Sequence, residues 1–337
     1  MKAFQLTKFG SAEKAFQLTD MPEPLPKSDE VIIEVEGFGL NYADVMARLG
    51  LYQDCPPLPC VLGYEAVGRV SAKGAETTGV EIGDRVTSFT RFGGYAEKVA
   101  ATHLGVAKIE DDVSIGDGAA LATQFCTAWY AAEECVRLHK GDKVLIHAAA
   151  GGVGTGLVQL CKRHGCEIYG TAGSQEKLDF IAELGVDHPI NYKKEDFYDY
   201  FKRQNIKLDV VFDSIGGDYV RKAWKLLDAG GRLVMFGAAQ MSDASNIFKK
   251  IGVGLGFGIY HPAQLLMAGK SLIGVGMLPL ADEKPLTLKR CLDGVVDLYQ
   301  KGELKPVVGG IFKADQLAEA HNFLANRKSM GKVVVSW

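Results

Sequence analysis

Apolar and polar positions follow two different patterns along the chain, and the change falls near Ser114. Before it, short runs rich in β-branched residues, such as Glu30–Leu40, are separated by Gly and Asp turns, which is typical of β-strands. After it, the Ala-rich stretch Ser114–Leu138 predicts a helix. Apolar runs then alternate with amphipathic segments as far as Gln240. The first third of the chain is therefore predicted to be mostly β, and the middle to be α/β.

The middle of the chain predicts a parallel sheet. Continuously apolar strands that alternate with helices indicate a sheet covered on both faces, and right-handed connections make such a sheet doubly wound. The strands are expected at Lys143–Ala148, Glu167–Thr171, Leu208–Asp213 and Gly231–Gly237, and the helices at Val153–His164, Gln175–Leu184, Asp196–Gln204 and Tyr219–Leu227.

The end of the chain returns to strand texture at "SLIGVGM" and closes with the helix "DQLAEAHNFLANRK" and the strand "GKVVVSW". We expect this tail to rejoin the first domain. The α/β fold would then consist of a β-rich domain, 1–122 with 268–337, and an inserted doubly wound domain, 123–267.

Length and composition support this picture. The chain has 337 residues, enough for two domains, with 47% hydrophobic and 23% charged residues. A net charge of −3 with no basic block argues against nucleic acid as a partner. No apolar run reaches the roughly 20 residues of a membrane-spanning helix, and the N-terminus lacks the apolar core of a secretory signal. Seven cysteines without a C-x-x-C pair are expected to be reduced thiols in a cytoplasmic protein.

The stretch "KVLIHAAAGGVGTG" is the candidate dinucleotide turn, since it follows an apolar strand and opens a helix. Unpaired N–H groups at a helix start suit a pyrophosphate. Gly151 and Gly152 let the backbone approach phosphate, Val153 begins the buried stripe of the helix, and Gly154 lets the helix pack on the strand. Ala149 replaces the usual first glycine, which is tolerable if its φ is negative. A strand–turn–helix without ligand is the alternative.

The next strand end indicates which nucleotide binds. In NAD-preferring sites an Asp or Glu about 20 residues further on binds the ribose 2′-hydroxyl. The corresponding residues are Gly173 and Ser174, so no carboxylate opposes a 2′-phosphate. Lys177 follows in the first helical turn and suits that phosphate, while Tyr192, after a further strand-like run, suits the adenine. A solvated lysine is the alternative, but the combination predicts NADP.

The sequence resembles the medium-chain dehydrogenase/reductase superfamily, in its zinc-free quinone oxidoreductase branch and there in the vesicle amine transport protein-like group. The resemblance extends over nearly the whole chain. The segments that carry it are Gly37–Tyr52, Pro59–Val70, "AAAGGVGTGLVQL", Gly185–Tyr192, Asp213–Gly217 and Asn326–Val335.

The resemblance implies a GroES-like domain formed by both chain ends, a Rossmann domain between them, NADP(H) and a homodimer, which edge strands such as "SLIGVGM" would build. Asn41 and Tyr52 would lie beside the nicotinamide, and Thr127 would open the helix below the cofactor. The pyrophosphate would be held by Gly151, Gly152, Val153 and Gly154. The 2′-phosphate end of the cofactor would lie against Gly173, Ser174, Lys177 and Tyr192. Ser214 would contact the ribose, and Arg327 would contact the phosphates.

No metal is expected. Zinc members of the superfamily keep a cysteine and a Gly-His-Glu motif, whereas this chain has Asn41 and "GYE", with Tyr64 in place of the histidine. Asn and Tyr are poor zinc donors beside thiolate and imidazole. Glu65 is interpreted as a structural buried carboxylate.

The function expected from these features is hydride transfer from NADPH to a quinone or an α,β-unsaturated carbonyl, with the chemistry supplied by the cofactor. Asn41 or Tyr52 would hydrogen-bond the acceptor carbonyl or the nicotinamide amide, and Tyr64 is a candidate proton donor, with a packed aromatic as its alternative. The Gly-rich segment Gly252–Met267 is interpreted as a cover for the substrate or as a loop against a dimer neighbour. An enoyl-thioester reductase and an NADPH-binding protein with little catalysis remain alternative functions.

Overall fold

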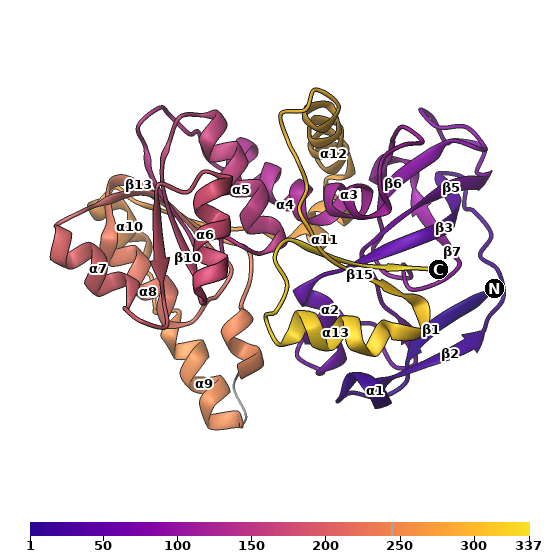
Figure 1. Cartoon of the computed structure of the whole chain (residues 1–337), viewed down its shortest axis with the longest axis horizontal. Coiled ribbons are helices and arrows are strands. Elements are labelled where there is room, and N and C mark those ends of the chain that lie inside the picture. The colour runs from indigo at the N-terminus through magenta and orange to yellow at the C-terminus, as the bar shows by residue number, and fades with distance from the viewer. Residues whose placement is uncertain (244–245) are drawn as a thin grey trace. The chain divides into compact units, whose positions relative to one another are not determined.

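A computed structural model describes residues 1–243 and 246–337, apart from the side chains of 243 and 247. The chain forms two compact units (Figure 1): unit 1 is Met1–Cys126 with Met277–Trp337, and unit 2 is Thr127–Gly276. Both chain ends therefore build unit 1. The boundary expected at 267/268 lies inside unit 2, because the strand Ser271–Gly274 continues the parallel sheet of that unit.

Unit 1 is rich in β-structure. Its three-stranded sheet has the order β2-β1-β4, and its seven-stranded sheet has the order β15-β16-β3-β5-β6-β8, with β7 also paired to β3. The last strand thus lies inside a sheet, between β15 and β3. The elements are β1 (Lys2–Leu6), α1 (Ala12–Ala15), β2 (Phe16–Asp20), β3 (Glu30–Leu40), α2 (Tyr42–Arg48), β4 (Cys60–Val61), β5 (Glu65–Lys73), β6 (Arg85–Phe89), β7 (Lys98–Thr102), β8 (Val106–Lys108), α11 (Met277–Glu283), α12 (Pro285–Gln300), β15 (Val308–Lys313), α13 (Leu317–Ala325) and β16 (Lys332–Ser336).

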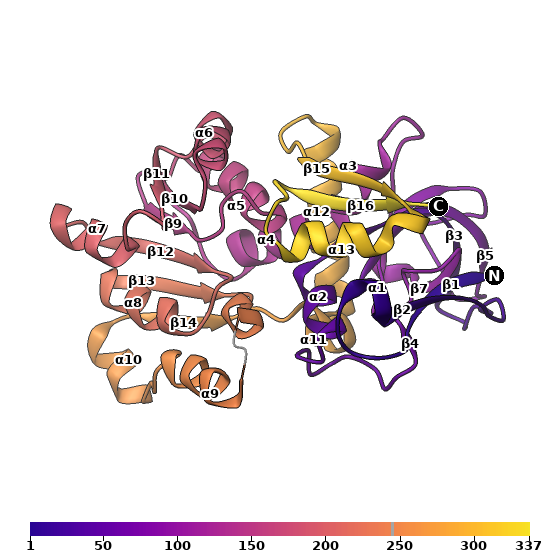
Figure 2. The same ribbon diagram turned by 60° about the horizontal axis from the view of Figure 1, so that its bottom comes forward.

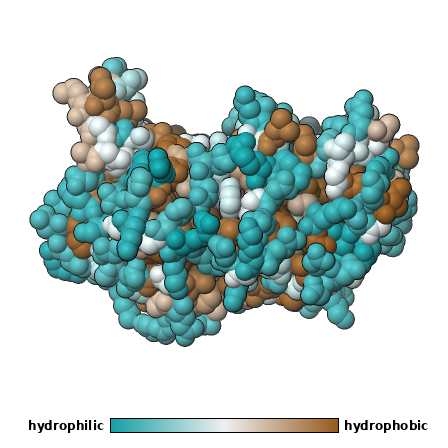
Figure 3. Space-filling view, turned by 90° about the horizontal axis from the view of Figure 1, so that it is seen from above, coloured by the Kyte–Doolittle hydropathy of each residue, from teal (hydrophilic) through white to brown (hydrophobic). Residues whose placement is uncertain are grey.

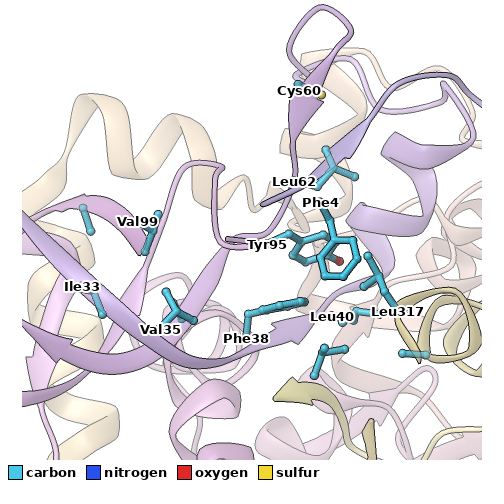
Figure 4. Close-up of a cluster of buried hydrophobic side chains, with 14 of the residues drawn as sticks. Phe4, Ile33, Val35, Phe38, Leu40, Cys60, Leu62, Tyr95, Val99 and Leu317 are labelled. Carbon is cyan, nitrogen blue, oxygen red and sulfur yellow. The ribbon is translucent and has the colours of Figure 1, made fainter. Parts of the chain in front are cut away.

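The core of unit 1 joins segments from both ends of the chain (Figure 4). Phe4 from β1, Phe38 from β3 and Leu317 from α13 gather around Tyr95. The Phe38 and Tyr95 rings stack with centroids 4.5 Å apart, and Tyr95 is fully buried. Burial of this apolar surface is the main force that ties the C-terminal tail to the N-terminal strands.

A long helical run leads from unit 1 into unit 2. It consists of α3 (Ile115–Ala120), η2 (Leu121–Phe125), α4 (Cys126–Trp129) and η3 (Tyr130–Glu134). Ser114 begins it, since its hydroxyl accepts a hydrogen bond of 2.9 Å from the Asp117 N–H. The run ends at Glu134, slightly before the expected Leu138, and two of its segments are π-helical.

Unit 2 holds a six-stranded sheet in the order β11-β10-β9-β12-β13-β14, and every neighbouring pair is parallel (Figure 2). This arrangement confirms the predicted doubly wound sheet. The elements are β9 (Lys143–Ile146), α5 (Gly152–Arg163), β10 (Glu167–Ala172), α6 (Gln175–Leu184), β11 (His188–Asn191), α7 (Phe197–Gln204), β12 (Leu208–Asp213), α8 (Asp218–Leu226), β13 (Leu227–Met235), α9 (Ile247–Gly256), α10 (Pro262–Ala268) and β14 (Ser271–Gly274).

Helices cover both faces of this sheet, with α5 and α6 on one side and α7 and α8 on the other (Figure 1). Phe197, Phe201 and Val220 from α7 and α8 pack on Leu145 and Val211 of the central strands. The strand order reverses between β9 and β12. Ligands of open α/β sheets bind at the carboxyl ends of the strands beside such a reversal, so this edge is where a site is expected.

The Gly-rich segment after β13, which the sequence suggested as a substrate cover or as a loop, contains the helices α9 and α10. Asn246 caps α9 through a 2.9 Å bond from the Lys249 N–H, and Gly269, at a φ of 60°, ends α10. Several large apolar side chains of this segment are exposed, although hydrophilic residues cover most of the face seen in Figure 3. They are Phe248, Ile251, Leu255, Ile259, Leu266 and Met267. Across the described residues, no helix has the length and apolar character needed to span a membrane.

Candidate functional site

The turn between β9 and α5 forms without glycine at its first position. The Ala149 N–H donates to the Thr171 carbonyl at 3.1 Å, which ties the turn to β10. The left-handed conformation falls one residue earlier, on Ala148 with a φ of 51°. The Gly151 N–H then donates back to the Ala148 carbonyl at 2.8 Å. Alanine at position 149 is compatible with this turn because the positive φ lies elsewhere.

The start of α5 presents backbone donors at the carboxyl edge of the sheet. Gly151 is the N-cap, and helical geometry leaves the N–H groups of Gly152, Val153 and Gly154 without a carbonyl in the preceding turn. A Cβ on Gly154 would overlap the Ala148 carbonyl oxygen and lie 2.8 Å from Ala149 Cα. Glycine at 154 therefore permits the close packing of helix on strand, and the free N–H groups with the helix dipole suit an anion.

A second group of residues meets at the end of β10. A Cβ on Gly173 would lie 2.5 Å from Tyr192 Oη, so the phenol lies directly against this glycine. Ser174 is the N-cap of α6, and its hydroxyl accepts a 3.4 Å hydrogen bond from the Lys177 N–H. Lys177 is half-buried in the first turn of that helix. Gly173, Ser174, Lys177 and Tyr192 thus form one local cluster next to the turn between β9 and α5.

Ser214 lies at the end of β12, next to β9 in the sheet. The neighbouring Asp213 is fully buried, and its carboxylate accepts hydrogen bonds from the N–H groups of Ile215 at 2.8 Å and Gly216 at 3.1 Å. Burial raises the pKa of Asp213 to about 6, against the opposing effect of these hydrogen bonds. Asp213 shapes the turn that carries Ser214, a role that the sequence analysis did not assign.

His147 is a further residue that the sequence analysis missed. It follows β9, is fully buried, and its Nδ1 lies 3.2 Å from Thr171 Oγ1. Its ring packs edge-on against Phe197 at 4.6 Å and Tyr219 at 4.9 Å. Burial lowers its pKa to about 3, so the imidazole is neutral at physiological pH. Its place directly before the turn between β9 and α5 gives it a packing role.

In unit 1, Asn41 belongs to a buried polar cluster. Its Nδ2 donates to Glu65 Oε1 at 2.8 Å, and its Oδ1 accepts from Lys332 Nζ at 3.1 Å. Lys332 and Glu65 also form an ion pair in which both side chains are fully buried. Burial lowers the pKa of Lys332, and Glu65 opposes that shift. Glu65 is a buried carboxylate as expected, but its partner Lys332 was not recognised.

Asp44 adds a second carboxyl group to this cluster. Its Oδ2 accepts a 2.8 Å hydrogen bond from the Asn41 backbone N–H, and the side chain is fully buried. Burial is the main cause that raises the pKa of Asp44 to about 7, and the charge of Glu65 adds to the shift. Two carboxyl groups and one ammonium thus share a buried region, where Asp44 keeps its proton to a higher pH than an exposed carboxyl group.

Tyr52 and Tyr64 lie together near this cluster, with ring centroids 6.1 Å apart in an edge-on arrangement. Tyr64 is 3% exposed and also packs against Phe92 at 5.2 Å, while Tyr52 is half-buried. The Tyr64 hydroxyl has no hydrogen-bond partner within residues 1–243 and 246–337. Burial raises the pKa of both phenols, so both hydroxyls keep their protons at neutral pH.

Two expected cofactor residues have unexpected local structure. Thr127 does not open a helix: it is a buried residue of α4, within the helical run that Ser114 begins. Arg327 is exposed after α13 and adopts a φ of 56°, which is unusual for a residue with a side chain. Its N–H donates to the Leu324 carbonyl at 3.0 Å and so closes the helix end.

No group of three or more His, Cys, Asp or Glu side chains suitable for a metal ion occurs in the part of the chain that the structure describes. At Asn41, where zinc relatives would carry a cysteine, the amide oxygen accepts a hydrogen bond from the ammonium of Lys332. This neighbourhood therefore already contains a positive charge supplied by the protein.

Comparisons with known proteins agree with both units. A family model described as zinc-binding dehydrogenase matches residues 152–291, and one described as alcohol dehydrogenase GroES-like domain matches residues 27–111. The synaptic vesicle membrane protein VAT-1 homolog of Danio rerio is 32% identical over 339 residues, which cover 99% of this chain and 70% of that protein. The quinone oxidoreductase of Homo sapiens is 28% identical over 339 residues, which cover 99% of this chain and 97% of that protein.

A solved structure of Escherichia coli quinone oxidoreductase complexed with NADPH superposes with a TM-score of 0.86 at 25% identity and covers 100% of both chains. The fold is thus shared along the entire chain, including the GroES-like unit and the Rossmann unit. By these similarities in sequence and structure, the chain belongs to the medium-chain dehydrogenase/reductase superfamily, in its quinone oxidoreductase and VAT-1-like branch.

Proposed function

We propose that this protein is an NADPH-dependent reductase that transfers hydride to a quinone or an α,β-unsaturated carbonyl without a metal ion. The observation that carries the cofactor choice is the end of β10, where Gly173 lies against Tyr192 and neither Gly173 nor Ser174 carries a carboxylate. An acidic residue at this position would repel a 2′-phosphate. The family assignment supports a reductase of this general class.

Residues at the carboxyl ends of the parallel strands in unit 2 suit successive parts of the NADP(H) molecule. The free N–H groups of Gly152, Val153 and Gly154 suit the pyrophosphate, and Ser214 at the next strand suits the ribose. Lys177 suits the 2′-phosphate, since its ammonium is a compact charge at a helix start. Tyr192 suits the adenine end, where its ring provides a flat surface. Thr127 and Arg327 remain further candidates for cofactor contacts.

The residues of unit 1 suit the acceptor side of the reaction. When bound, NADPH supplies the hydride from C4 of its nicotinamide ring. The protonated hydroxyls of Tyr52 and Tyr64 and the amide of Asn41 are hydrogen-bond donors for the oxygen of an acceptor carbonyl, on which negative charge develops. A conjugated acceptor is already polarised, so these donors replace the Lewis acid that an unactivated ketone needs.

The direct test is oxidation of NADPH and NADH, followed at 340 nm, against a panel of quinones, enones and enoyl-CoA thioesters. We expect turnover with a quinone or enone and a preference for NADPH. Turnover limited to enoyl-CoA would favour an enoyl-thioester reductase. Tight NADPH binding without turnover of any acceptor would favour a binding protein, and stoichiometric zinc in the purified protein would contradict the metal-free proposal.

The cofactor preference is tested by Lys177→Ala. Loss of an ammonium that pairs with the 2′-phosphate is expected to raise KM for NADPH by about tenfold or more and leave KM for NADH unchanged. Lys140→Ala is the matched control, because Lys140 is an exposed lysine that precedes β9, at the opposite end of the strands. Faster use of NADH by the unmodified protein would contradict the role of Lys177.

The expected homodimer is part of this proposal. The strand β14 forms one edge of the sheet in unit 2 and offers unpaired backbone groups for a second copy. Light scattering of the purified protein is expected to give twice the chain mass of 36.4 kDa. A concentration-independent monomer would contradict it.

A further inference from the structure

The buried ion pair between Lys332 and Glu65 calls for a physical explanation. Both side chains have a relative exposure of 0%. Transfer of two charges out of water costs several kcal/mol per ion, and an apolar pair of similar volume is often equally stable or more so. The ion pair Arg85–Glu36 of the same unit leaves 32% of its glutamate side chain exposed and so avoids much of this cost.

The pair is held at the point where three adjacent strands end or begin. Asn41 follows β3, Glu65 begins β5 and Lys332 begins β16, and β3 lies between the other two strands in the sheet. A Cβ on Gly39 would overlap both the Glu65 carboxylate and the Lys332 side chain. Glycine at that position is therefore what admits the ion pair so close to the strand.

The chemistry of the pair selects one orientation of the Asn41 amide. The Lys332 ammonium has only donors, and it donates to Asn41 Oδ1 at 3.1 Å. The Glu65 carboxylate has only acceptors, and it accepts from Asn41 Nδ2 at 2.8 Å. Rotation of the amide by 180° would place NH2 against an ammonium and an oxygen against a carboxylate, so only one orientation is compatible with the pair.

One amide hydrogen of Asn41 is not used by this network. The Nδ2 group carries two hydrogens, and the bond to Glu65 uses one of them. The backbone of Asn41 is also fixed, because its N–H donates to Asp44 Oδ2 at 2.8 Å. Asn41 retains an exposure of 7%, whereas Lys332 and Glu65 have none. A donor with a fixed direction is thus available at the margin of a dry cluster.

We propose that Lys332 and Glu65 are positioning residues whose ion pair fixes the Asn41 amide so that its remaining N–H donates to a carbonyl oxygen of the reacting partners. This inference rests on the proposed reductase function, in which the acceptor carries a carbonyl oxygen. Neither charged residue touches the reacting atoms. Their effect on the reaction passes through Asn41.

The test uses the full-length protein and the double variant Lys332→Met/Glu65→Leu, which removes both charges of the ion pair together and so leaves neither partner buried alone. We expect kcat/KM for the quinone or enone substrate to fall by about tenfold or more, as in Asn41→Ala, at a thermal stability close to that of the unmodified protein. Combination of all three substitutions is expected to lower kcat/KM little beyond either variant, because the same donor is lost each time. If the fold-reductions in kcat/KM of Asn41→Ala and of the double variant multiply in the combined variant, the proposal is overturned.

A second readout does not depend on turnover. The side-chain NH2 resonance of Asn41, assigned by its loss in Asn41→Ala, is expected to be slow to exchange with solvent in the unmodified protein and fast to exchange in Lys332→Met/Glu65→Leu. An unchanged resonance would overturn the positioning role. If the unmodified protein reduces no acceptor, the proposed function fails, and this measurement still decides whether the ion pair holds the amide.

Arg69→Gln/Asp111→Asn is the matched control. This pair lies in the same unit at 2.8 Å, but its side chains are 46% and 77% exposed. Neither kcat/KM nor the Asn41 resonance is expected to change in the control. A loss of activity there equal to that of the buried pair would show that removal of any ion pair from unit 1 has this effect, which would also overturn the proposal.

Discussion

At the scale of single residues, this protein is distinguished by the polar groups that it buries. Asp44, Glu65 and Lys332 are all fully enclosed in unit 1. Two carboxyl groups beside one ammonium cannot all be ionised without a net buried charge, and the structure favours a protonated Asp44. Protonation of this one side chain should therefore couple the stability of the fold to pH.

Asp44→Asn tests that coupling. The pKa of Asp44 is about 7 in the folded protein, above the value of about 4 of an unfolded chain, so the folded state holds the extra proton between these pH values. The contribution of Asp44 to stability therefore falls as the pH rises from 4 to 7. The melting temperature of Asp44→Asn relative to the unmodified protein is expected to rise over that range.

Thermal unfolding from pH 4 to pH 8 measures this difference. Asp54→Asn, which removes an exposed carboxyl group from a nearby loop, is the control. A melting-temperature difference for Asp44→Asn that follows the control at every pH would contradict a raised pKa for Asp44.

At the scale of elements, two helices of unit 2 make different use of glycine. In α5, a Cβ on Gly154 would overlap the Ala148 carbonyl oxygen, so the helix start has no room for a larger residue. In α9, a Cβ on Gly254 would meet nothing within 4 Å. The first glycine is required by packing against the turn between β9 and α5, whereas the second only weakens its helix.

The substitutions Gly154→Ala and Gly254→Ala should therefore change stability in opposite directions. Gly154→Ala is expected to destabilise the protein by about 1–3 kcal/mol through overpacking and to weaken NADPH binding as the helix start shifts. Gly254→Ala is expected to stabilise it by up to about 1 kcal/mol through helix propensity. Chemical denaturation and NADPH titration measure both effects, and a loss of stability in Gly254→Ala equal to that in Gly154→Ala would refute the packing argument.

At the scale of the whole molecule, the order of the chain does not match the order of the sheets. The last strand, β16, pairs with β3 from the first part of the chain, with Val334 opposite Gly39. Unit 1 is therefore complete only after the final residues have been added, while unit 2 is continuous in sequence. Damage to β16 should disrupt unit 1 more than unit 2.

Val334→Asp tests this dependence. Val334 has no exposure, and an unpaired carboxylate in its place would cost several kcal/mol. In limited proteolysis followed by mass spectrometry, we expect early cleavage within 1–126 and 277–337 and persistence of fragments from 127–276. Ile311→Asp, in the neighbouring strand β15 at a residue 68% exposed, is the control and is expected to resist cleavage like the unmodified protein. Early cleavage of unit 2 in Val334→Asp would contradict the separation of the two units.

The sequence by itself determined the periodic parts of this protein. The strands and helices of unit 2 follow from apolar runs and amphipathic segments, because burial on both faces of a parallel sheet imposes those patterns locally. The turn between β9 and α5 was also readable, since glycines are local signals, while the roles of this turn and of the end of β10 in cofactor binding stay predictions. The helices α9 and α10 were not predicted from the alternation of Gly with apolar residues, because helix formation there depends on caps at Asn246 and His261.

Only the tertiary structure decided which distant residues share a buried environment. Lys332 is a single charge in an apolar terminal strand, and nothing local predicts that it meets Asn41 and Glu65. The positive φ of Ala148 likewise belongs to a turn that hydrogen bonds tie to β10. Local pattern fixes secondary structure because it reflects the environment on each face of an element, whereas long-range pairing brings buried charges together and sets their protonation and their function.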